Sequence, residues 1–377
     1  MPEAPTAPSR ASTQAVLTID LGALVANWRK LADLAAPAAC AAVVKADAYG
    51  VGLEPAIRAL AKAGCSTFFV AQASEGARAR AALGAASPHR IHVLNGLLPG
   101  DDILAAHAEH RLTPVLCDLD QARAWAAFSR ARGEPAPAAL QIDTGMNRLG
   151  VGLAQLDDAL AVEGLAIDLV MSHMVSSEDA GDAHNARQIA AFRAARDRFP
   201  GVAASLANSS AIFLPARPCF DLARPGYALY GGNPTPGQPN PMRAVVRLEA
   251  RIIQLRAIGV GETVGYNGQW TARRPTRLAT IGVGYADGLP RALMATDTRP
   301  GGEAMVRGVR CPFAGRVSMD LTVIDVTDAP ADLAPGDMVE LMGEAITVDD
   351  IGARAGTIGY EVLTALGRRY FRRYVGG

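Results

Sequence analysis

The sequence predicts an α/β protein with an N-terminal (β/α)8 barrel of the TIM type, over residues 15–241, and a C-terminal, mostly antiparallel β domain, over residues 242–377. Three observations support this prediction. Short apolar runs alternate with helical periodicities from about residue 16 to about residue 230. A linker rich in proline, glycine and asparagine, GGNPTPGQPNP, follows. Beyond the linker, β-like runs are separated by glycine, proline and aspartate, and helical patterns are few.

The predicted barrel units follow one another in order. Each begins with an apolar run, which we interpret as a strand, and most continue with a segment whose apolar residues recur every three or four positions. The expected strands are VLTI, AAVVK, TFFVA, RIHVLN, TPVLC, ALQID, AIDLVMSH, ASLANSS and YALYGG. The expected helices run from LGALVANWRKLADLA to DAHNARQIAAFRAARDRF. The strands are nearly continuous apolar runs, as expected where both faces are buried, and so long a series favours a closed parallel barrel.

The second part of the chain predicts a β domain. Its expected strands are MRAVVRLEARIIQLRAI, RLATIGVGY, EAMVRG, LTVIDV and DMVELMG. At the other end of the chain, residues 1–14 are rich in proline, alanine and serine, and we expect a disordered tail there. This tail has no basic segment followed by an apolar one, so a signal peptide is not expected.

Charge and cysteine content narrow the function classes. The 37 Lys and Arg residues balance the 37 Asp and Glu residues, which argues against a nucleic-acid-binding or polybasic membrane protein. The longest apolar run, LAAPAACAAVV, contains a proline and is too short to span a bilayer. The cysteines are scattered, without a C-x-x-C pair, which is typical of reduced thiols in a cytoplasmic protein. They are Cys40, Cys65, Cys117, Cys219 and Cys311.

Lys45 ends the second expected strand, in AAVVKADAYGVG. Barrel strands converge at their carboxyl ends on the active-site face, where a desolvated lysine can attack carbonyl groups and form a Schiff base. A surface lysine at a strand end is an equally good interpretation of this stretch alone. Arg148, in DTGMNRLGVG, offers a fork that suits a carboxylate or phosphate, among glycines that allow close approach. A glycine-rich turn with a solvated arginine is the simpler alternative.

Two further segments come late in the series, where TIM barrels often bind phosphate. Arg224 precedes Pro-Gly in DLARPGYALYGG, and backbone N–H groups at such a turn can hold an anion. ANSSA, at residues 207–211, is another polar turn, and each segment can also be a polar loop cap. GVGYADG lacks the dinucleotide-binding spacing. The H-x-x-H pairs lack an obvious set of further ligands, so we expect no metal site.

Nine segments taken together resemble the alanine racemase family, pyridoxal-phosphate enzymes of the barrel fold type. They are VVKADAYGVG, DTGMNRLG, MSHMVSSED, ANSSA, RPGYALYGG, TVGYNGQW, VGYADGLPR, GRVSMDLT and TIGYEVLTALGRRYFRRY. Each segment is weak alone, but nine in order, across both predicted parts, are very specific. The resemblance covers nearly the whole chain after the tail.

The resemblance implies that Lys45 holds pyridoxal 5'-phosphate (PLP) as a Schiff base and serves as one of two catalytic bases. Tyr266, contributed by the partner subunit of a homodimer, would be the other base. Arg148 would position the substrate carboxylate and the phenolic oxygen of the cofactor. Arg224 would face the pyridine nitrogen, and His173 would lie beside the ring and support Arg224.

The resemblance also implies two larger sets of residues and a reaction. The cofactor phosphate would be bound by Tyr49, Ser209, Gly226, Tyr227 and Tyr360. The entrance and substrate pocket would be lined by Tyr285, Met319 and Asp320, with Met319 also reaching across the dimer. The implied reaction is the interconversion of L- and D-alanine, which needs two bases on opposite sides of a planar carbanion. Its implied role is the supply of D-alanine for peptidoglycan.

Two positions depart from the family pattern. In many members the residue seven before the substrate arginine is a carbamylated lysine, whereas this chain has Gln141, which can accept a hydrogen bond from Arg148 but cannot carry a carbamate. Our hypothesis is that an anion such as chloride supplies the missing charge beside these side chains. Ser318, in VSMD, stands where a cysteine is common, and we expect little consequence.

Other functions stay open beside this one. An amino-acid racemase with broader substrates is the nearest alternative, although that activity usually goes with a secreted form. A decarboxylase of the same fold type would need a reactive cysteine before an aspartate, which VSMD does not offer. A non-catalytic PLP carrier would share the barrel but lack the β domain. A structural protein would leave Lys45, Arg148 and Arg224 unexplained.

Overall fold

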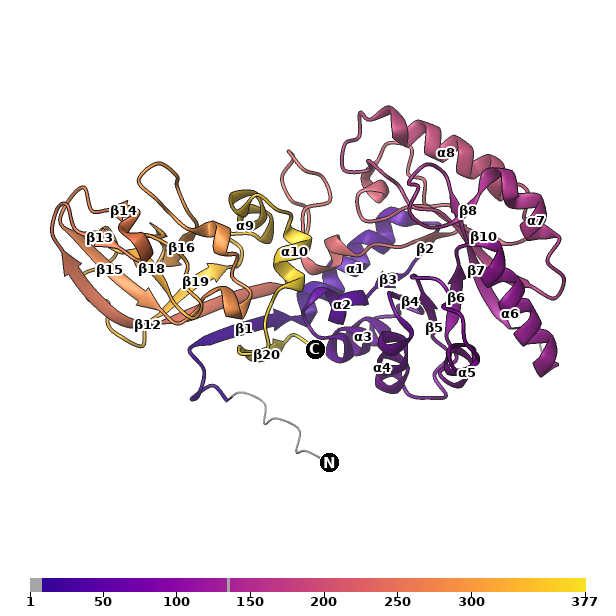
Figure 1. Cartoon of the computed structure of the whole chain (residues 1–377), viewed down its shortest axis with the longest axis horizontal. Coiled ribbons are helices and arrows are strands. Elements are labelled where there is room, and N and C mark those ends of the chain that lie inside the picture. Colours follow the sequence, from indigo (N-terminus) through magenta and orange to yellow (C-terminus); the bar gives the residue numbers. More distant parts are fainter. Residues whose placement is uncertain (1–8, 134–135) are drawn as a thin grey trace.

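The computed structural model describes residues 9–133 and 136–377, so the greater part of the expected tail lies outside the described residues. Two lobes lie side by side along the long axis (Figure 1). The right-hand lobe holds the parallel strands with their helices, and the left-hand lobe holds the mainly antiparallel sheet. Thr13 and Gln14, which we expected in the tail, belong to the folded part. Thr13 is buried, and the Gln14 carbonyl accepts a hydrogen bond from the Arg251 N–H at 2.8 Å.

The right-hand lobe is a closed parallel barrel, which confirms the predicted fold class. Seven strands form the hydrogen-bonded path β10-β9-β7-β6-β5-β4-β3, β11 pairs with β2, and β2 continues into β3 after one residue. The barrel closes where the N–H of Asp221 donates to the carbonyl of Ala204 at 2.9 Å, beside β11 and β10. The strands are β2 (Ala39–Cys40), β3 (Ala42–Val43), β4 (Thr67–Val70), β5 (Arg90–Val93), β6 (Thr113–Leu116), β7 (Pro137–Asp143), β9 (Ala166–Met171), β10 (Ala203–Ser205) and β11 (Leu222–Ala223).

Helices surround the barrel. A short strand, β8 (Val151–Gly152), pairs parallel with the last two residues of β7. Aspartate side chains cap three of the helices by accepting an N–H of the first turn, which satisfies a donor that has no partner inside the helix. The capping residues are Asp20, Asp118 and Asp182. The helices are α1 (Leu21–Ala35), α2 (Lys45–Tyr49), α3 (Leu53–Lys62), α4 (Ala73–Leu83), α5 (Asp101–Glu109), α6 (Leu119–Arg132), α7 (Leu156–Leu160) and α8 (Ala183–Arg196).

The left-hand lobe is built on one main sheet. Its strand order is β17-β16-β19-β12-β1-β20, and β15 pairs with both β12 and β18. Two helices, α9 (Val348–Ala355) and α10 (Gly359–Thr364), lie between this sheet and the barrel (Figure 1). The strands are β1 (Ala15–Asp20), β12 (Val246–Ile258), β13 (Thr263–Val264), β14 (Trp270–Thr271), β15 (Thr276–Ile281), β16 (Glu303–Val306), β17 (Val309–Pro312), β18 (Thr322–Asp325), β19 (Met338–Met342) and β20 (Phe371–Val375).

The prediction that VLTI is the first barrel strand is wrong. It forms β1, which pairs antiparallel with β12 and parallel with β20 in the left-hand sheet. An apolar run shows that a strand is buried, but it does not show which sheet the strand joins. Because β1 crosses to the other lobe, a domain boundary near residue 241 stays a proposal.

Two local predictions also need correction. YALYGG is not a strand: Tyr227–Tyr230 form a short 3-10 helix, η3, and the last barrel strand is β11. An apolar run of four residues is compatible with either structure. Strand β3 ends at Val43, so Lys45 does not end a strand but begins the turn that follows it. In the part of the chain that the structure describes, no helix combines the length and the apolar character needed to cross a membrane.

Candidate active site

A cavity of about 860 Å³ opens at the carboxyl ends of the barrel strands. It brings together nine of the thirteen predicted site residues, which come from loops spread along the chain. They are Lys45, Tyr49, Arg148, His173, Ser209, Arg224, Gly226, Tyr227 and Tyr360. The last of these lies on α10, so the left-hand lobe contributes to the wall of the cavity.

Lys45 projects from an unusual turn. The four residues after it, Ala46 to Tyr49, all have φ angles between 53° and 54°, in the left-handed region. Non-glycine residues pay roughly 1–2 kcal/mol each for this conformation, so the surrounding structure must hold the turn in place. Backbone bonds contribute, since Ala48 N–H donates to the Val44 carbonyl at 3.0 Å and Gly50 N–H to the Ala46 carbonyl at 2.9 Å.

The environment of the Lys45 amine favours its neutral form. Partial burial, and then the positive charge of Arg148, lower the pKa of Lys45, while the Glu75 carboxylate acts in the opposite direction. A half-buried amine with a lowered pKa at the mouth of a barrel supports the functional interpretation over that of a surface lysine.

Arg224 lines the cavity and is 4% exposed. Its guanidinium donates to the Ser172 carbonyl at 2.5 Å and to the Ser205 hydroxyl, which itself donates to the carbonyl of Leu222. No carboxylate forms an ion pair with it among the described residues. Burial lowers the pKa of Arg224 to about 9, so the side chain still carries its charge at neutral pH.

The hydrogen bonds of Arg224 differ from the expected support by His173. In the described part of the chain, Ser172 and Ser205 fix the guanidinium, and the His173 ring makes no hydrogen bond to it. His173 nevertheless lines the cavity, and burial followed by the charge of Arg224 lowers its pKa to about 3. The imidazole is therefore neutral, and its role beside a bound ring stays a prediction.

A ring stack lies beneath Arg224. The guanidinium carbon is 5.9 Å from the centre of the Phe69 ring, and Phe69 stacks on His92 with 4.7 Å between ring centres. His92 is 1% exposed, and its Nδ1 has no hydrogen-bond partner among the residues that the structure describes. Burial lowers the pKa of His92 to about 3. The folded protein therefore keeps this ring uncharged well below pH 6.

This buried imidazole makes the stability depend on pH. The pKa of His92 is lower in the folded than in the unfolded protein, so the unfolded state binds the extra proton and stability falls as the pH drops through 6.5. Linkage predicts a loss of about 2 kcal/mol from His92 between pH 7 and pH 5. Urea unfolding at both pH values should therefore show a smaller loss in His92→Leu than in the unchanged protein. Equal losses would contradict the prediction.

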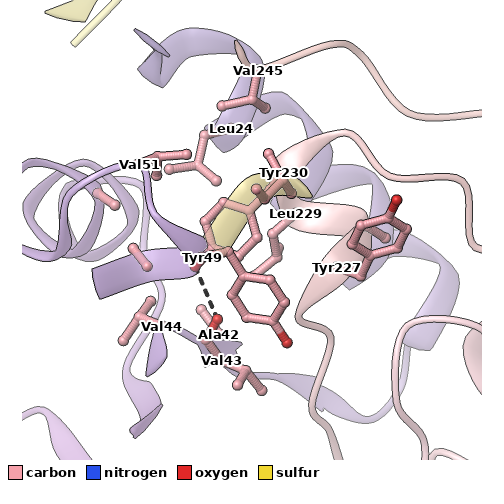
Figure 2. Packing of buried hydrophobic residues seen from close by; sticks show 14 of the residues in the cluster. Leu24, Ala42, Val43, Val44, Tyr49, Val51, Tyr227, Leu229, Tyr230 and Val245 are labelled. Carbon is pink, nitrogen blue, oxygen red and sulfur yellow. Dashed lines mark hydrogen bonds between the residues drawn. The ribbon is translucent and has the colours of Figure 1, made fainter. Parts of the chain in front are cut away.

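Tyr49 and Ser209 form a cradle of hydroxyl groups on the other side of the cavity. The Ser209 oxygen accepts from the N–H groups of Gly226 at 3.0 Å and Ala228 at 3.2 Å, so its own proton is available for a ligand. Figure 2 shows Tyr49 beside Tyr230, on which it stacks with 4.6 Å between ring centres. The dashed bond there runs from the Tyr230 hydroxyl to the Val43 carbonyl.

The absence of a side chain at Gly226 is what makes room for this cradle. A Cβ at that position would lie 2.3 Å from the Tyr49 hydroxyl oxygen. We expect Gly226→Ala to lower the free energy of unfolding by about 1–3 kcal/mol, because Tyr49 must move from its packed position. Urea unfolding measures the loss, and Gly181→Ala, whose Cβ would come no closer than 3.4 Å to another atom, is the control. Equal effects of the two substitutions would contradict the prediction.

The other two predicted phosphate ligands have carboxylate partners. The hydroxyl of Tyr227 donates to Asp349 at 2.6 Å, and that of Tyr360 donates to Glu178 at 3.1 Å. The two rings stack with 3.9 Å between centres. Burial, with the nearby carboxylates, raises the pKa of both phenols. A phosphate would have to compete for these protons, so Tyr49 and Ser209 are the better-placed donors.

The residues present fit PLP. An amine for the aldehyde, hydroxyl donors around a glycine for the phosphate, and a buried cation with neutral partners lie in one cavity. Gln141 differs from the expectation, because its amide donates to the Leu149 carbonyl at 2.9 Å and no bond to Arg148 is present among the described residues. The amide therefore fixes the backbone next to Arg148.

Four predicted residues do not line this cavity. Tyr266 is 68% exposed, Met319 54% and Tyr285 41%, and Asp320 pairs with Arg369 at 2.7 Å. Strands β13 and β14, which flank the 3-10 turn that carries Tyr266, lie at the outer end of the left-hand lobe, far from α2 (Figure 1). Tyr266 cannot reach the Lys45 of its own chain in this arrangement.

Comparisons with known proteins show which family the chain belongs to. The family model "Alanine racemase, N-terminal domain" matches residues 19–234, and "Alanine racemase, C-terminal domain" matches residues 245–374. An alanine racemase from Methylobacterium sp. (strain 4-46) is 55% identical over 95% of this chain and 97% of its own length. A catabolic alanine racemase from Agrobacterium fabrum is 46% identical over 95% of this chain and 92% of its own.

A solved structure of an alanine racemase also matches this chain. The alanine racemase from Bartonella henselae, with covalently bound pyridoxal phosphate, superposes with a TM-score of 0.89 at 39% identity, over 98% of this chain and 100% of that one. Both lobes are therefore matched in sequence, and 98% of the chain is matched in three dimensions. The chain belongs to the alanine racemase family.

Proposed function

We propose that this chain interconverts L- and D-alanine with PLP bound covalently to Lys45. The observation that carries the proposal is that one cavity at the barrel mouth is lined by the Lys45 amine, the Arg224 guanidinium and the hydroxyl cradle of Tyr49 and Ser209. When bound, PLP supplies an electron sink for the carbanion that forms when the α-proton leaves. The chain itself must orient the substrate, move the proton and shield both from water.

Lys45 is the base on one face of the substrate. Partial burial lowers its pKa, which raises the fraction of neutral amine that can take a proton near neutral pH. The left-handed turn aims the side chain from the end of β3 into the cavity. Arg148 is exposed and lines the cavity, and its guanidinium suits a substrate carboxylate, which it would bind as a fork.

Tyr266 is the base on the opposite face, supplied by the partner subunit of a homodimer. Its 3-10 turn is flanked by β13 and β14, which lie far from α2 of the same chain (Figure 1), and 68% of the residue is exposed. Tyr285 and Met319, also on the left-hand lobe, are large apolar residues with high exposure. A surface of this kind is typical of a region that a partner covers, and a two-fold axis would bring each left-hand lobe to the other subunit's barrel.

Arg224 would hold the pyridine nitrogen of PLP. A guanidinium donates a hydrogen bond but does not give up a proton, so it would leave the ring nitrogen neutral and limit side reactions. We expect Arg224→Glu to slow racemisation and to raise the amount of pyruvate made per inversion. Counting both products from D-alanine tests this, and Arg224→Lys, which keeps the positive charge, is the control. An unchanged product ratio in Arg224→Glu would count against the proposed role.

The biological role has two candidates. We favour the supply of D-alanine for peptidoglycan by a cytoplasmic enzyme, and the catabolic relative from Agrobacterium fabrum makes alanine degradation the alternative. Deletion of the gene should create a growth requirement for D-alanine if the role is biosynthetic. Normal growth without D-alanine, together with poor growth on alanine, would favour the catabolic role.

The proposed activity is tested directly on the purified protein. It should be yellow from the lysine-bound cofactor, and borohydride followed by peptide mapping should place the label on Lys45. D-alanine should then be converted to the L form, with serine, lysine and arginine as substrates that distinguish a broad-specificity racemase. A colourless protein that does not respond to added PLP would refute the proposal. A yellow protein without racemisation would make it a PLP carrier.

A further inference from the structure

The left-handed turn after Lys45 is held from outside by a neighbouring helix. Four consecutive non-glycine residues in this conformation do not stay there on their own preference. The left-handed part of the turn starts at Ala46, directly after Lys45, so the Ala46 backbone helps to set the direction in which the lysine side chain points. A hydrogen bond that holds the Ala46 N–H in place therefore also restricts the position of the Lys45 amine.

Glu75, in the first turn of α4, makes that contact. One carboxylate oxygen, Oε1, accepts the Ala46 N–H at 2.6 Å. The other oxygen, Oε2, accepts the N–H of Ala71 at 2.8 Å and that of Gln72 at 3.3 Å. The second oxygen is sufficient to cap the start of α4. The first oxygen is therefore not needed by its own helix and acts on a segment 29 residues earlier in the chain.

An outer group of charges braces the same turn less strongly. Arg78, one turn further along α4, bonds Asp47 at 2.7 Å and Glu54 at 2.8 Å. These side chains are between about a third and a half exposed, where ion pairs contribute little because solvent screens them. Among the described residues, Glu54 makes no hydrogen bond to the turn, which makes it a matched control for a carboxylate of the same network.

We propose that Glu75 is a positioning residue for Lys45: its Oε1 pins the left-handed turn at Ala46 and so holds the amine toward the cofactor. The inference rests on the proposed covalent attachment of PLP at Lys45. The same carboxylate places a negative charge near the protonated amine. The hydrogen bond of Glu75 acts on Lys45 through the Ala46 backbone, and Glu75 is not among the residues that line the cavity.

The test measures how firmly the lysine-bound cofactor is held, using the holoenzyme. In excess hydroxylamine, which traps the released aldehyde, the visible band should decay about tenfold faster in Glu75→Gln than in the unchanged protein, a factor that corresponds to about 1.4 kcal/mol. Glutamine has one acceptor oxygen, so it can cap α4 or bond Ala46 but cannot do both. Glu75→Asp, which keeps the charge and can still cap the helix, is too short to reach Ala46 and should show a similar increase.

Two further variants separate positioning from a structural role. Glu54→Gln should decay within about twofold of the unchanged protein, since exposed pairs contribute little. Ala46→Gly, added to Glu75→Gln, should slow the decay again, because glycine adopts the left-handed conformation without strain. A helix cap alone would not be rescued by a change at residue 46.

Two results would contradict the inference about Glu75, and a third would contradict the proposed function. Decay in Glu75→Gln at the rate of the unchanged protein, or decay that Ala46→Gly does not slow, would overturn the inference. Failure of the unchanged protein and of Glu54→Gln to bind PLP would refute the proposed function instead.

Discussion

Replacing Lys45 by alanine abolishes the covalent attachment of PLP and reduces alanine racemisation by at least about ten-thousandfold, the upper range for one general base. The reason is that one side chain has two roles, as the amine that holds the cofactor and as the base on one face. Lys45 supplies the primary amine of the cavity in the part of the chain that the structure describes. Visible absorbance and the rate of L-alanine formation from D-alanine measure the two losses.

The matched control for this substitution is Lys62→Ala, at the exposed end of α3. It should keep both the yellow colour and the rate. Added methylamine should restore part of the racemisation in Lys45→Ala, because a free amine can enter the space left by the side chain and act as the base. A yellow Lys45→Ala protein that racemises alanine at the normal rate would rule out Lys45 as the attachment site.

Tyr266→Phe should reduce racemisation about a hundredfold to ten-thousandfold while the cofactor stays bound to Lys45. Only a hydroxyl is removed, from a residue that is 68% exposed, so the fold and the colour should not change. Parallel measurement of absorbance and rate separates this effect from loss of the cofactor. An undiminished rate would show that Tyr266 is not the second base.

Hybrid dimers show which subunit provides the phenol. One subunit carries Lys45→Ala and the other Tyr266→Phe, and two different affinity tags isolate the mixed species. If each site takes its lysine from one subunit and its tyrosine from the partner, one of the two sites is intact and about half of the wild-type activity returns. If both groups came from one chain, neither site would be intact and the hybrid would stay inactive.

The barrel could be predicted because its strands carry a strong local signal. Runs such as TFFVA are buried on both faces, and an acidic first turn, with Asp120, marks the start of α6. The partner of VLTI could not be predicted, because sheet membership depends on residues more than 200 positions away in β12 and β20. The helical state of Tyr227–Tyr230 was hidden for a related reason, since four apolar residues have no distinguishing period.

The motifs predict the site residues themselves, but they do not predict the residues that hold those side chains in place. Lys45, Arg148 and Arg224 stand out as charges in apolar or glycine-rich surroundings. Ser205 and Glu75 do not, because serine on a strand and glutamate at a helix start are common for local reasons. Their contacts with Arg224 and Ala46 arise only when the barrel closes. The left-handed turn was also hidden, since its residues include alanine and tyrosine, which favour other conformations.

The position of β1 has a consequence for how the chain is made on the ribosome. This first strand lies between β12 and β20 and hydrogen-bonds to both, so its two neighbours are synthesised more than 200 residues later. During translation the backbone N–H and C=O groups on both edges of β1 stay unpaired until β12 and β20 are synthesised, while the barrel strands can already assemble. Synthesis of β20 then completes this part of the sheet around β1 and joins segments that lie far apart in the chain into one cooperative unit.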